Sequence, residues 1–121
     1  MLISLIIPCY NEEASLPILW KALEDVKALR PEFEYEYIFV DDGSRDRTLP
    51  ILEDLAARDA SVHYLSFSRN FGKEAGMYAG LNEARGEWVA ILDADMQDPP
   101  SLLPQMFDIL LKGEIDMVAT R

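Results

Sequence analysis

The stretch Leu2-Ile-Ser-Leu-Ile-Ile7 opens the chain with a short and nearly unbroken hydrophobic run. A strand with one face in water alternates apolar and polar residues, whereas this run is typical of a strand buried on both faces. Apolar residues then recur at helical spacing between Leu16 and Leu29, and Pro31 ends that segment. Asn11 stands where the N-cap of this helix is expected. This part of the chain therefore predicts a buried strand followed by an amphipathic helix.

The same alternation continues along the chain. Further strands are predicted at residues 35–40, 62–67, 88–92 and 115–119, and further helices at 46–58, at 73–85 and from Pro99 or Pro100 to 112. Pro50 falls in the first turn of its helix, where proline is tolerated. Strand–helix–strand units at this spacing form right-handed crossovers and a mainly parallel sheet. The sequence predicts one α/β domain over residues 1–121, with helices on both faces of the sheet.

Charge and composition exclude several classes of protein. The chain has 121 residues and a net charge of −11, which argues against a nucleic-acid-binding surface. Its one cysteine, Cys9, can form no disulfide within the chain and fits a reducing compartment. No apolar run reaches the roughly 18 residues of a membrane span, and the start of the chain lacks the features of a signal peptide. We expect a soluble, cytoplasmic chain in which Cys9 is a small buried side chain.

Polar residues gather where the predicted strands end. The segments that follow the first four strands are 8–12, 41–44, 68–70 and 93–95. Ligands of an open α/β sheet bind outside the carboxyl ends of its strands. The clustering therefore predicts a binding site at this edge, away from His63, which starts the third strand and has a structural role.

Asp93 and Asp95 raise a question of charge. Two carboxylates about 4 Å apart repel by roughly 4 kcal/mol at an effective dielectric near 20, so a positive charge is expected beside them. Residues i and i+2 of an extended chain project to the same side. Hard oxygen ligands of this kind, with Gln97 and Asp98 close behind, suit Mg²⁺ or Mn²⁺ rather than zinc. The alternative is that Asp98 caps the next helix while Asp93 and Asp95 are solvated.

Asp41 and Asp42 close the second predicted strand and point to opposite sides of it, so one of them faces the cleft in either register. A carboxylate there can accept a hydrogen bond from a ribose hydroxyl or a base N–H. The alternative is a strand end with an Asx cap and a glycine turn at Gly43. No Gly-x-Gly-x-x-Gly follows the first strand and no P-loop is present, which argues against a Rossmann dehydrogenase.

Three motifs resemble, in order and spacing, those of the family 2 glycosyltransferases of GT-A fold. They are Ile7-Pro-Cys-Tyr-Asn-Glu-Glu13, Val40-Asp-Asp-Gly-Ser44 and Leu92-Asp-Ala-Asp-Met-Gln-Asp-Pro-Pro100. The segment Ser68-Arg-Asn-Phe-Gly-Lys-Glu-Ala-Gly-Met-Tyr-Ala-Gly80, with Ala119-Thr-Arg121, is similar to the polyprenyl-phosphate branch of that family. That branch includes dolichyl-phosphate mannose synthases and bacterial undecaprenyl-phosphate glucosyl and aminoarabinosyl transferases. The resemblance covers the whole chain and implies the Rossmann-like, nucleotide-binding half of a GT-A fold.

The resemblance also implies roles for individual residues. The UDP- or GDP-sugar would be bound by Pro8, Tyr10, Glu12, Val40, Asp41, Asp42, Ala94 and Arg121. The catalytic residues would be Asp93 and Asp95, with Mg²⁺ or Mn²⁺ held by Asp93, Asp95 and Gln97. The positive charge expected beside the aspartates would then be the metal ion, which stabilises the leaving nucleotide diphosphate. Arg69 and Lys73 can help to neutralise phosphates, or can belong to a solvated loop.

The implied reaction is an inverting, metal-dependent transfer of a sugar from a nucleotide diphosphate to a polyprenyl phosphate. Members of the family are longer than this chain, so it resembles the N-terminal, donor-binding portion of such an enzyme, and inactivity of this portion alone stays open. The acceptor site and the segments that associate with the membrane, at its cytoplasmic face, would lie in the C-terminal part. Two alternatives stay open, namely transfer to a carbohydrate hydroxyl by a polysaccharide-type enzyme, and a nucleotide-sugar-binding module without catalysis.

Overall fold

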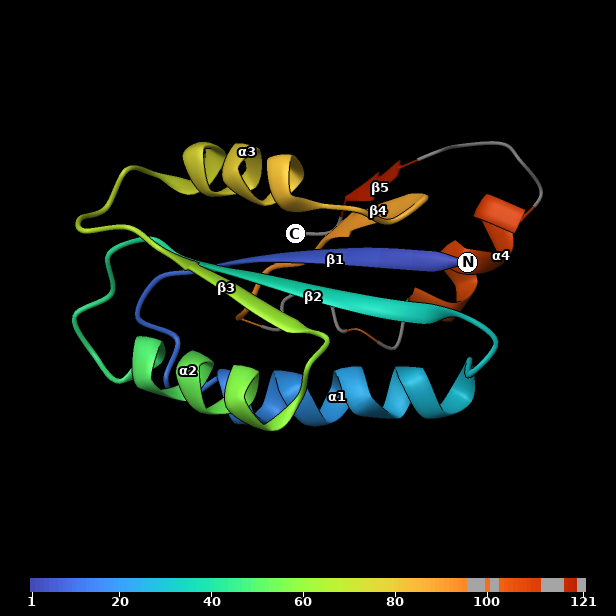
Figure 1. Ribbon diagram of the computed structural model, residues 1–121, viewed down its shortest axis with the longest axis horizontal. Helices are drawn as coiled ribbons and strands as arrows, with labels where there is room; N and C mark the ends of the chain where they lie inside the picture. The colour runs from blue at the N-terminus through green and yellow to red at the C-terminus, as the bar shows by residue number, and fades with distance from the viewer. Residues whose placement is uncertain (96–99, 101–102, 112–116, 120–121) are drawn as a thin grey trace.

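Strands and helices alternate along the chain, as the sequence predicts (Figure 1). The computed structural model describes residues 1–95, 100, 103–111 and 117–119. The elements are β1 (Leu2–Cys9), α1 (Leu16–Leu29), β2 (Glu34–Asp41), α2 (Thr48–Arg58), β3 (Val62–Ser66), α3 (Lys73–Glu83), β4 (Trp88–Ile91), α4 (Leu103–Leu111) and β5 (Met117–Ala119). Among the described residues, no helix is long and apolar enough to cross a membrane.

The strands form one five-stranded sheet in the order β3-β2-β1-β4-β5, and every pairing is parallel. The central strand is β1, whose Ile6 pairs with Ile38 of β2 and Ile91 of β4. All three are buried, as expected for a strand with neighbours on both edges and helices on both faces. Along the chain, β2 and β3 are added on one side of β1, and β4 and β5 are then added on its other side.

The crevice opens between β1 and β4, where the direction of building reverses. Leu92 N donates to Ile6 O at 2.9 Å, and the register of the two strands ends at Ile6. Pro8, two residues further along β1, faces the same neighbour after β4 has diverged. Its missing N–H therefore costs the sheet no hydrogen bond. Proline at this position fits a strand end that opens into a binding crevice.

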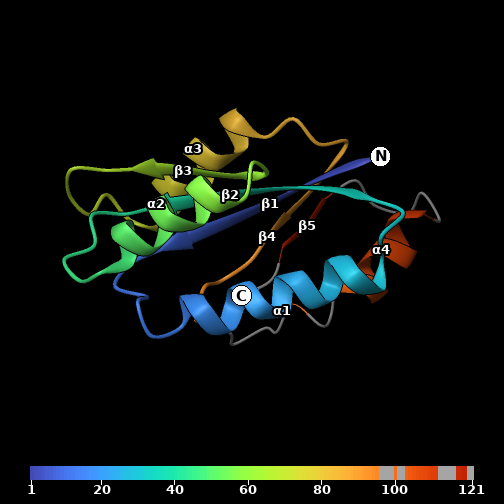
Figure 2. The ribbon, with the colours of Figure 1, turned by 60° about the horizontal axis from the view of Figure 1, so that its bottom comes forward.

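Helices cover both faces of the sheet (Figure 2). The larger core packs α1, α2 and α4 against one face, with the fully buried side chains of Leu19, Leu52 and Phe107 among its members. On the other face, α3 packs Met77 and Leu81 against a smaller core that includes Ile6. The prediction of an α/β fold with helices on both faces is confirmed.

Two helix starts differ from the prediction. Asn11 is not the N-cap of α1, because Ser15 precedes the helix and Asn11 has a left-handed backbone with φ of 53°. Its side-chain oxygen instead accepts a hydrogen bond from Arg45 N at 2.8 Å. The second helix begins at Thr48 rather than at Asp46, whose carboxylate accepts from Thr48 N at 2.9 Å. The predicted cap at Asp98 lies outside the described residues.

Arg30 holds α4 against the end of α1. Its guanidinium donates to Pro104 O at 3.1 Å and to the Asp108 carboxylate at 3.2 Å. It also lies over the rings of Phe33 and Phe107, with centroids 5.2 and 5.8 Å from its central carbon. These contacts fix the segment that the chain reaches after it leaves the carboxyl end of β4.

Gly80 allows α3 to approach β1 closely, and we predict that Gly80→Ala destabilises the fold. A Cβ at this position would lie 2.4 Å from Ile6 Cγ2, in a fully buried layer. Such overpacking costs about 1–3 kcal/mol. Gly76→Ala is a matched control, since its Cβ would lie 3.6 Å from Pro8 Cβ, in ordinary contact. Urea unfolding should show a lower midpoint for Gly80→Ala only; equal midpoints for the two variants would contradict the prediction.

Candidate functional site

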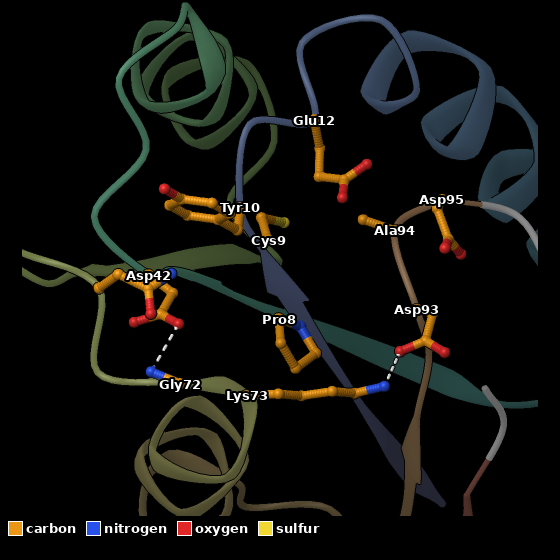
Figure 3. A pocket seen from close by; sticks show the side chains of 11 residues that line it. Pro8, Cys9, Tyr10, Glu12, Asp42, Gly72, Lys73, Asp93, Ala94 and Asp95 are labelled. Atoms are coloured by element: carbon orange, nitrogen blue, oxygen red, sulfur yellow. Dashed lines mark hydrogen bonds and ion pairs between the residues drawn. The ribbon is translucent and has the colours of Figure 1, made fainter.

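A cavity of about 430 Å³ lies at the carboxyl ends of β1, β2 and β4 (Figure 3). The loop that leads into α3 forms its remaining wall. The lining residues are Pro8, Cys9, Tyr10, Glu12, Asp42, Asn70, Gly72, Lys73, Asp93, Ala94 and Asp95. Seven of them are residues that the resemblance implies, and they come from three segments of the sequence. The crevice predicted from the strand ends is therefore present.

The wall after β1 is fastened to the segment that precedes α2. Asn11 N donates to Ser44 Oγ at 2.9 Å, and Glu12 N donates to Thr48 Oγ1 at 2.8 Å. These bonds hold Glu12 over the cavity and leave the residue Tyr10 43 % exposed at its edge. A half-exposed ring on an anchored backbone offers a face on which a flat group can pack.

Tyr10 also borders a second, smaller cavity of about 270 Å³ on its other side. This cavity is lined by Asp41, the turn at residues 43–45 and the segment 66–70. Gly43 has φ of +74°, and a Cβ there would lie 2.3 Å from the carbonyl carbon of Arg69. Only glycine allows this turn to lie against the segment after β3. The predicted backbone role of Gly43 is confirmed.

Asp41 and Asp42 are both buried and have different partners. Asp41 Oδ1 accepts from Ser44 N at 3.1 Å, which forms the turn that the sequence suggested as the alternative role. The two oxygens of Asp42 accept from Phe71 N at 2.7 Å and Gly72 N at 3.0 Å. Asp42 lines the main cavity and Asp41 the smaller one, so each carboxylate reaches one of the two hollows.

The segment after β4 brings two carboxylates to the opposite wall. Asp93 is 14 % exposed at its side chain and forms an ion pair with Lys73. Ala94 is buried, and Asp95 is exposed and lines the cavity beside Asp93. Carboxylate oxygens suit Mg²⁺ or Mn²⁺, which keep water and phosphate oxygens as their other ligands. The donor set therefore fits a divalent cation held by few protein ligands, although the described residues contain no group of three His, Cys, Asp or Glu placed to hold a metal.

The pKa of Glu12 is raised by its surroundings, which include the negative charges of this wall. Burial raises the pKa of its carboxyl, and a hydrogen bond with Ser15 partly offsets that rise. The charges of Asp95, Asp46 and Asp93 raise the pKa further. A cation bound between Glu12 and the aspartates would relieve this repulsion.

We predict that Glu12→Gln stabilises the free protein at pH 7. The folded chain raises the pKa of Glu12 above its ordinary value of 4.5, so the charged form is less stable in the folded state than in the unfolded state. The advantage of glutamine should be present above the folded pKa and should disappear as the pH falls below 4.5. Urea midpoints between pH 3.5 and pH 7 measure this, with Glu13→Gln on the same loop as control. A midpoint difference independent of pH would contradict it.

Lys73 is a cavity residue for which the sequence left two roles open, neutralising phosphates or belonging to a solvated loop. Among the described lining residues it is the only cationic side chain, beside four carboxylates. Asn70 belongs to the strand-end segment 68–70 that the sequence places at this edge, whereas Gly72 was not predicted for the site. The signal in the sequence is helical spacing, since Lys73 lies three and seven residues before Gly76 and Gly80, which face the sheet.

One predicted site residue lines neither cavity, and two fall outside the described residues. Val40 is fully buried in the core beneath α3 and does not line the cavity. Gln97 and Arg121 lie outside the described residues. Cys9 is buried, its thiol donates to Ile7 O at 3.4 Å, and burial raises its pKa, which confirms a structural side chain. His63 lies in β3, away from both cavities.

Comparison with known proteins gives a consistent set of similarities. A family model described as "Glycosyl transferase family 2" matches residues 4–121. The chain is 41 % identical over 121 residues to a bactoprenol glucosyl transferase of Shigella phage SfV, covering 100 % of this chain and 39 % of the relative. It is 44 % identical over 120 residues to an undecaprenyl-phosphate 4-deoxy-4-formamido-L-arabinose transferase of Pseudomonas fluorescens, covering 98 % of this chain and 34 % of the relative. The chain thus spans well under half the length of these relatives.

Two solved structures share the fold. S. aureus TarS 1-349 in complex with UDP has a TM-score of 0.74 at 27 % identity, covering 93 % of this chain and 32 % of that one. The mannosyltransferase PcManGT from Pyrobaculum calidifontis, in complex with GDP-Man and Mn²⁺, has a TM-score of 0.66 at 25 % identity, covering 77 % and 27 %. The parallel sheet and its helices are those of these GT-A glycosyltransferases.

Proposed function

Because this chain belongs to glycosyl transferase family 2, we propose that it is the donor-binding part of an enzyme that transfers a sugar from a UDP- or GDP-sugar to a polyprenyl phosphate. The observation that carries the proposal is the cavity between the ends of β1 and β4, where the sheet order reverses. An open α/β sheet binds nucleotides at this point. The printed names of the two relatives support a polyprenyl acceptor.

The nucleoside would lie against Tyr10, which borders both hollows. Its half-exposed ring can pack on the base or ribose. Pro8 and Glu12, which line the same cavity at the end of β1 and just after it, would form the rest of this wall. Asp42 lines the main cavity and Asp41 the smaller one. Asp42 also fixes the loop at residues 71–72. The UDP complex of the TarS structure supports this class of ligand.

The donor diphosphate would lie toward Asp93 and Asp95, the residues that we propose hold Mg²⁺ or Mn²⁺, with Gln97 as a further ligand and Ala94 packed between them. When bound, a divalent cation stabilises the charge that develops on the leaving diphosphate. The oxygen donors of this wall and the Mn²⁺ complex of PcManGT support the assignment. Arg121 would reach the diphosphate or the acceptor phosphate.

The acceptor chemistry agrees with the side chains of the site. A phosphate monoester is already ionised near neutral pH, so its oxygen can attack the anomeric carbon without a strong base. Among the described lining residues there is no histidine. Attack from the face opposite the leaving diphosphate inverts the anomeric centre. Since the acceptor is a lipid, we propose that the whole protein acts at the cytoplasmic face of a membrane.

A transfer assay tests the proposed function. The whole protein is incubated with radiolabelled UDP-glucose or GDP-mannose and Mn²⁺, with a short polyprenyl phosphate as acceptor and, in parallel, with an oligosaccharide, and the lipid phase is separated from the aqueous phase. We expect label in the lipid phase, released by mild acid as a sugar phosphate linkage requires. Transfer to an oligosaccharide alone would identify a polysaccharide-type enzyme, and binding without transfer to either acceptor would identify a binding module.

A further inference from the structure

Lys73 is placed at the cavity by the spacing of α3. It is the first residue of the helix, and it precedes Gly76 and Gly80, whose missing side chains let the helix lie on β1. Residues three and seven positions apart share a helix face. Lys73 therefore belongs to the sheet-facing row, one turn before Gly76, whose Cβ would lie 3.6 Å from Pro8 Cβ near the end of β1. Figure 3 shows its side chain extended past Pro8 toward Asp93.

The backbone that carries Lys73 is fixed from the other side of the cavity. The Asp42 carboxylate accepts hydrogen bonds from Phe71 N and Gly72 N, at 2.7 and 3.0 Å. Asp42 follows β2 and Asp93 follows β4, so the entry to α3 is tied to both strand ends that flank β1. The ammonium group reaches Asp93 from an anchored main chain, through a side chain that has four rotatable carbon–carbon bonds.

We propose that Lys73 is an exchangeable counter-ion, which neutralises Asp93 in the free protein and moves to the donor diphosphate when a divalent cation takes Asp93. The inference rests on the proposed function and adds a residue and an order of events to it. The ion pair supplies the positive charge that the sequence predicts beside Asp93 and Asp95 while no donor is bound.

The physical case is one of competition. An ammonium group and a divalent cation repel each other and cannot both lie against the same carboxylate without cost. The Lys73 side chain is 49 % exposed and that of Asp93 only 14 %, so the ammonium can leave into water while the carboxylate stays largely covered. A nucleoside diphosphate brings new negative charge to the mouth of the cavity, where the released ammonium can bind it. Lys73 thereby weakens binding of the metal alone and strengthens binding of the metal together with nucleotide, so that binding of the two ligands is coupled.

This reasoning predicts effects of opposite sign in one variant. In Lys73→Met, calorimetric titration with Mn²⁺ alone should show about fivefold tighter binding than in the unchanged protein, because the competing cation is gone. With saturating Mn²⁺, the affinity for UDP or GDP, whichever binds the unchanged protein more tightly, should fall about tenfold. A residue with a merely structural role would weaken both.

Two further variants control the experiment. Lys27→Met removes the same charge from the far end of α1 and should change neither affinity. Lys73→Arg keeps a cation beside Asp93, so its Mn²⁺ affinity should stay low and most of its nucleotide affinity should return. Thermal unfolding without ligands verifies that all variants fold.

The outcomes separate the two claims. Equal Mn²⁺ affinity in Lys73→Met and the unchanged protein, or none detectable in either, overturns the exchange. Weaker binding of both ligands in Lys73→Met also overturns it. If the unchanged protein binds Mn²⁺ but neither UDP nor GDP, the proposed function fails, while tighter Mn²⁺ binding by Lys73→Met would still support Lys73 as the counter-ion of Asp93.

Discussion

Asp95→Asn is expected to abolish the metal dependence of nucleotide binding and to weaken binding of UDP or GDP about 100-fold, measured by calorimetry in saturating Mn²⁺. Asparagine keeps the size of the side chain and removes the charge that a divalent cation requires. Removing a residue that only supports a metal ligand lowers metal affinity about 10- to 100-fold. Removing the ligand itself should cost at least as much, so about 100-fold is the smallest loss of affinity that we expect.

Asp25→Asn, which removes a carboxylate from the exposed face of α1, is the matched control and should bind as the unchanged protein does. Without metal, the unchanged protein and Asp95→Asn should bind nucleotide equally weakly. Strong binding that is independent of Mn²⁺ in both proteins would contradict a metal role for Asp95.

The second large effect is expected for Asp42→Ala, which should lower the free energy of unfolding by about 3 kcal/mol. The buried carboxylate accepts from two main-chain N–H groups, Phe71 N and Gly72 N, and hydrogen bonds to a charged group contribute about 1.5–3 kcal/mol each. Hydrogen exchange at these two amides should accelerate, because the loop that enters α3 loses its anchor.

Asp54→Ala serves as the control. Its carboxylate pairs with Arg58 on the surface of α2, with both side chains more than half exposed, so its removal should cost well under about 1 kcal/mol. If Asp42→Ala unfolds at the same urea concentration as Asp54→Ala, the Asp42 carboxylate does not anchor the loop. The nucleotide affinities of the same two variants test whether Asp42 also contributes to the donor site.

Strands and the edge that carries the site were predictable because both depend on local patterns. The apolar runs at β1 and β4 marked strands buried on both faces, and the polar residues directly after them, such as Tyr10 and Asp95, had to share one edge of a parallel sheet. The order of the strands was not predictable in this way. The adjacency of β1 and β4, which opens the crevice, depends on contacts between segments about 85 residues apart.

Errors arose where a local rule competes with a tertiary contact. Asn11 has the side chain of a helix cap, yet it binds Arg45 N across the site and the helix starts later. A side chain that can hydrogen-bond to any nearby amide carries no information on which amide it will meet. Asp46 acts in the same way, since its carboxylate accepts from Glu13 N at 3.1 Å as well as from Thr48 N, and α2 begins at Thr48.

Lys73 shows the limit of reading charge from the sequence. The repulsion between Asp93 and Asp95 indicated a missing positive charge, and the resemblance pointed to a metal ion. The structure adds a second source, because the ammonium of Lys73 forms an ion pair with Asp93. Its adjacent residues do not distinguish this lysine from one in a solvated loop; its place at the cavity follows from its helical spacing to Gly76 and Gly80, through which α3 packs on β1.

The central claim is that the cavity between β1 and β4 binds a nucleoside diphosphate with a divalent cation, and one calorimetric series tests it directly. UDP, GDP and ADP are titrated into the chain in the presence of Mn²⁺ and again in EDTA. We predict one binding site for UDP or GDP, at least tenfold tighter with Mn²⁺, and much weaker binding of ADP. No detectable heat with any of the three nucleotides in Mn²⁺, in a protein that unfolds cooperatively, would contradict the account.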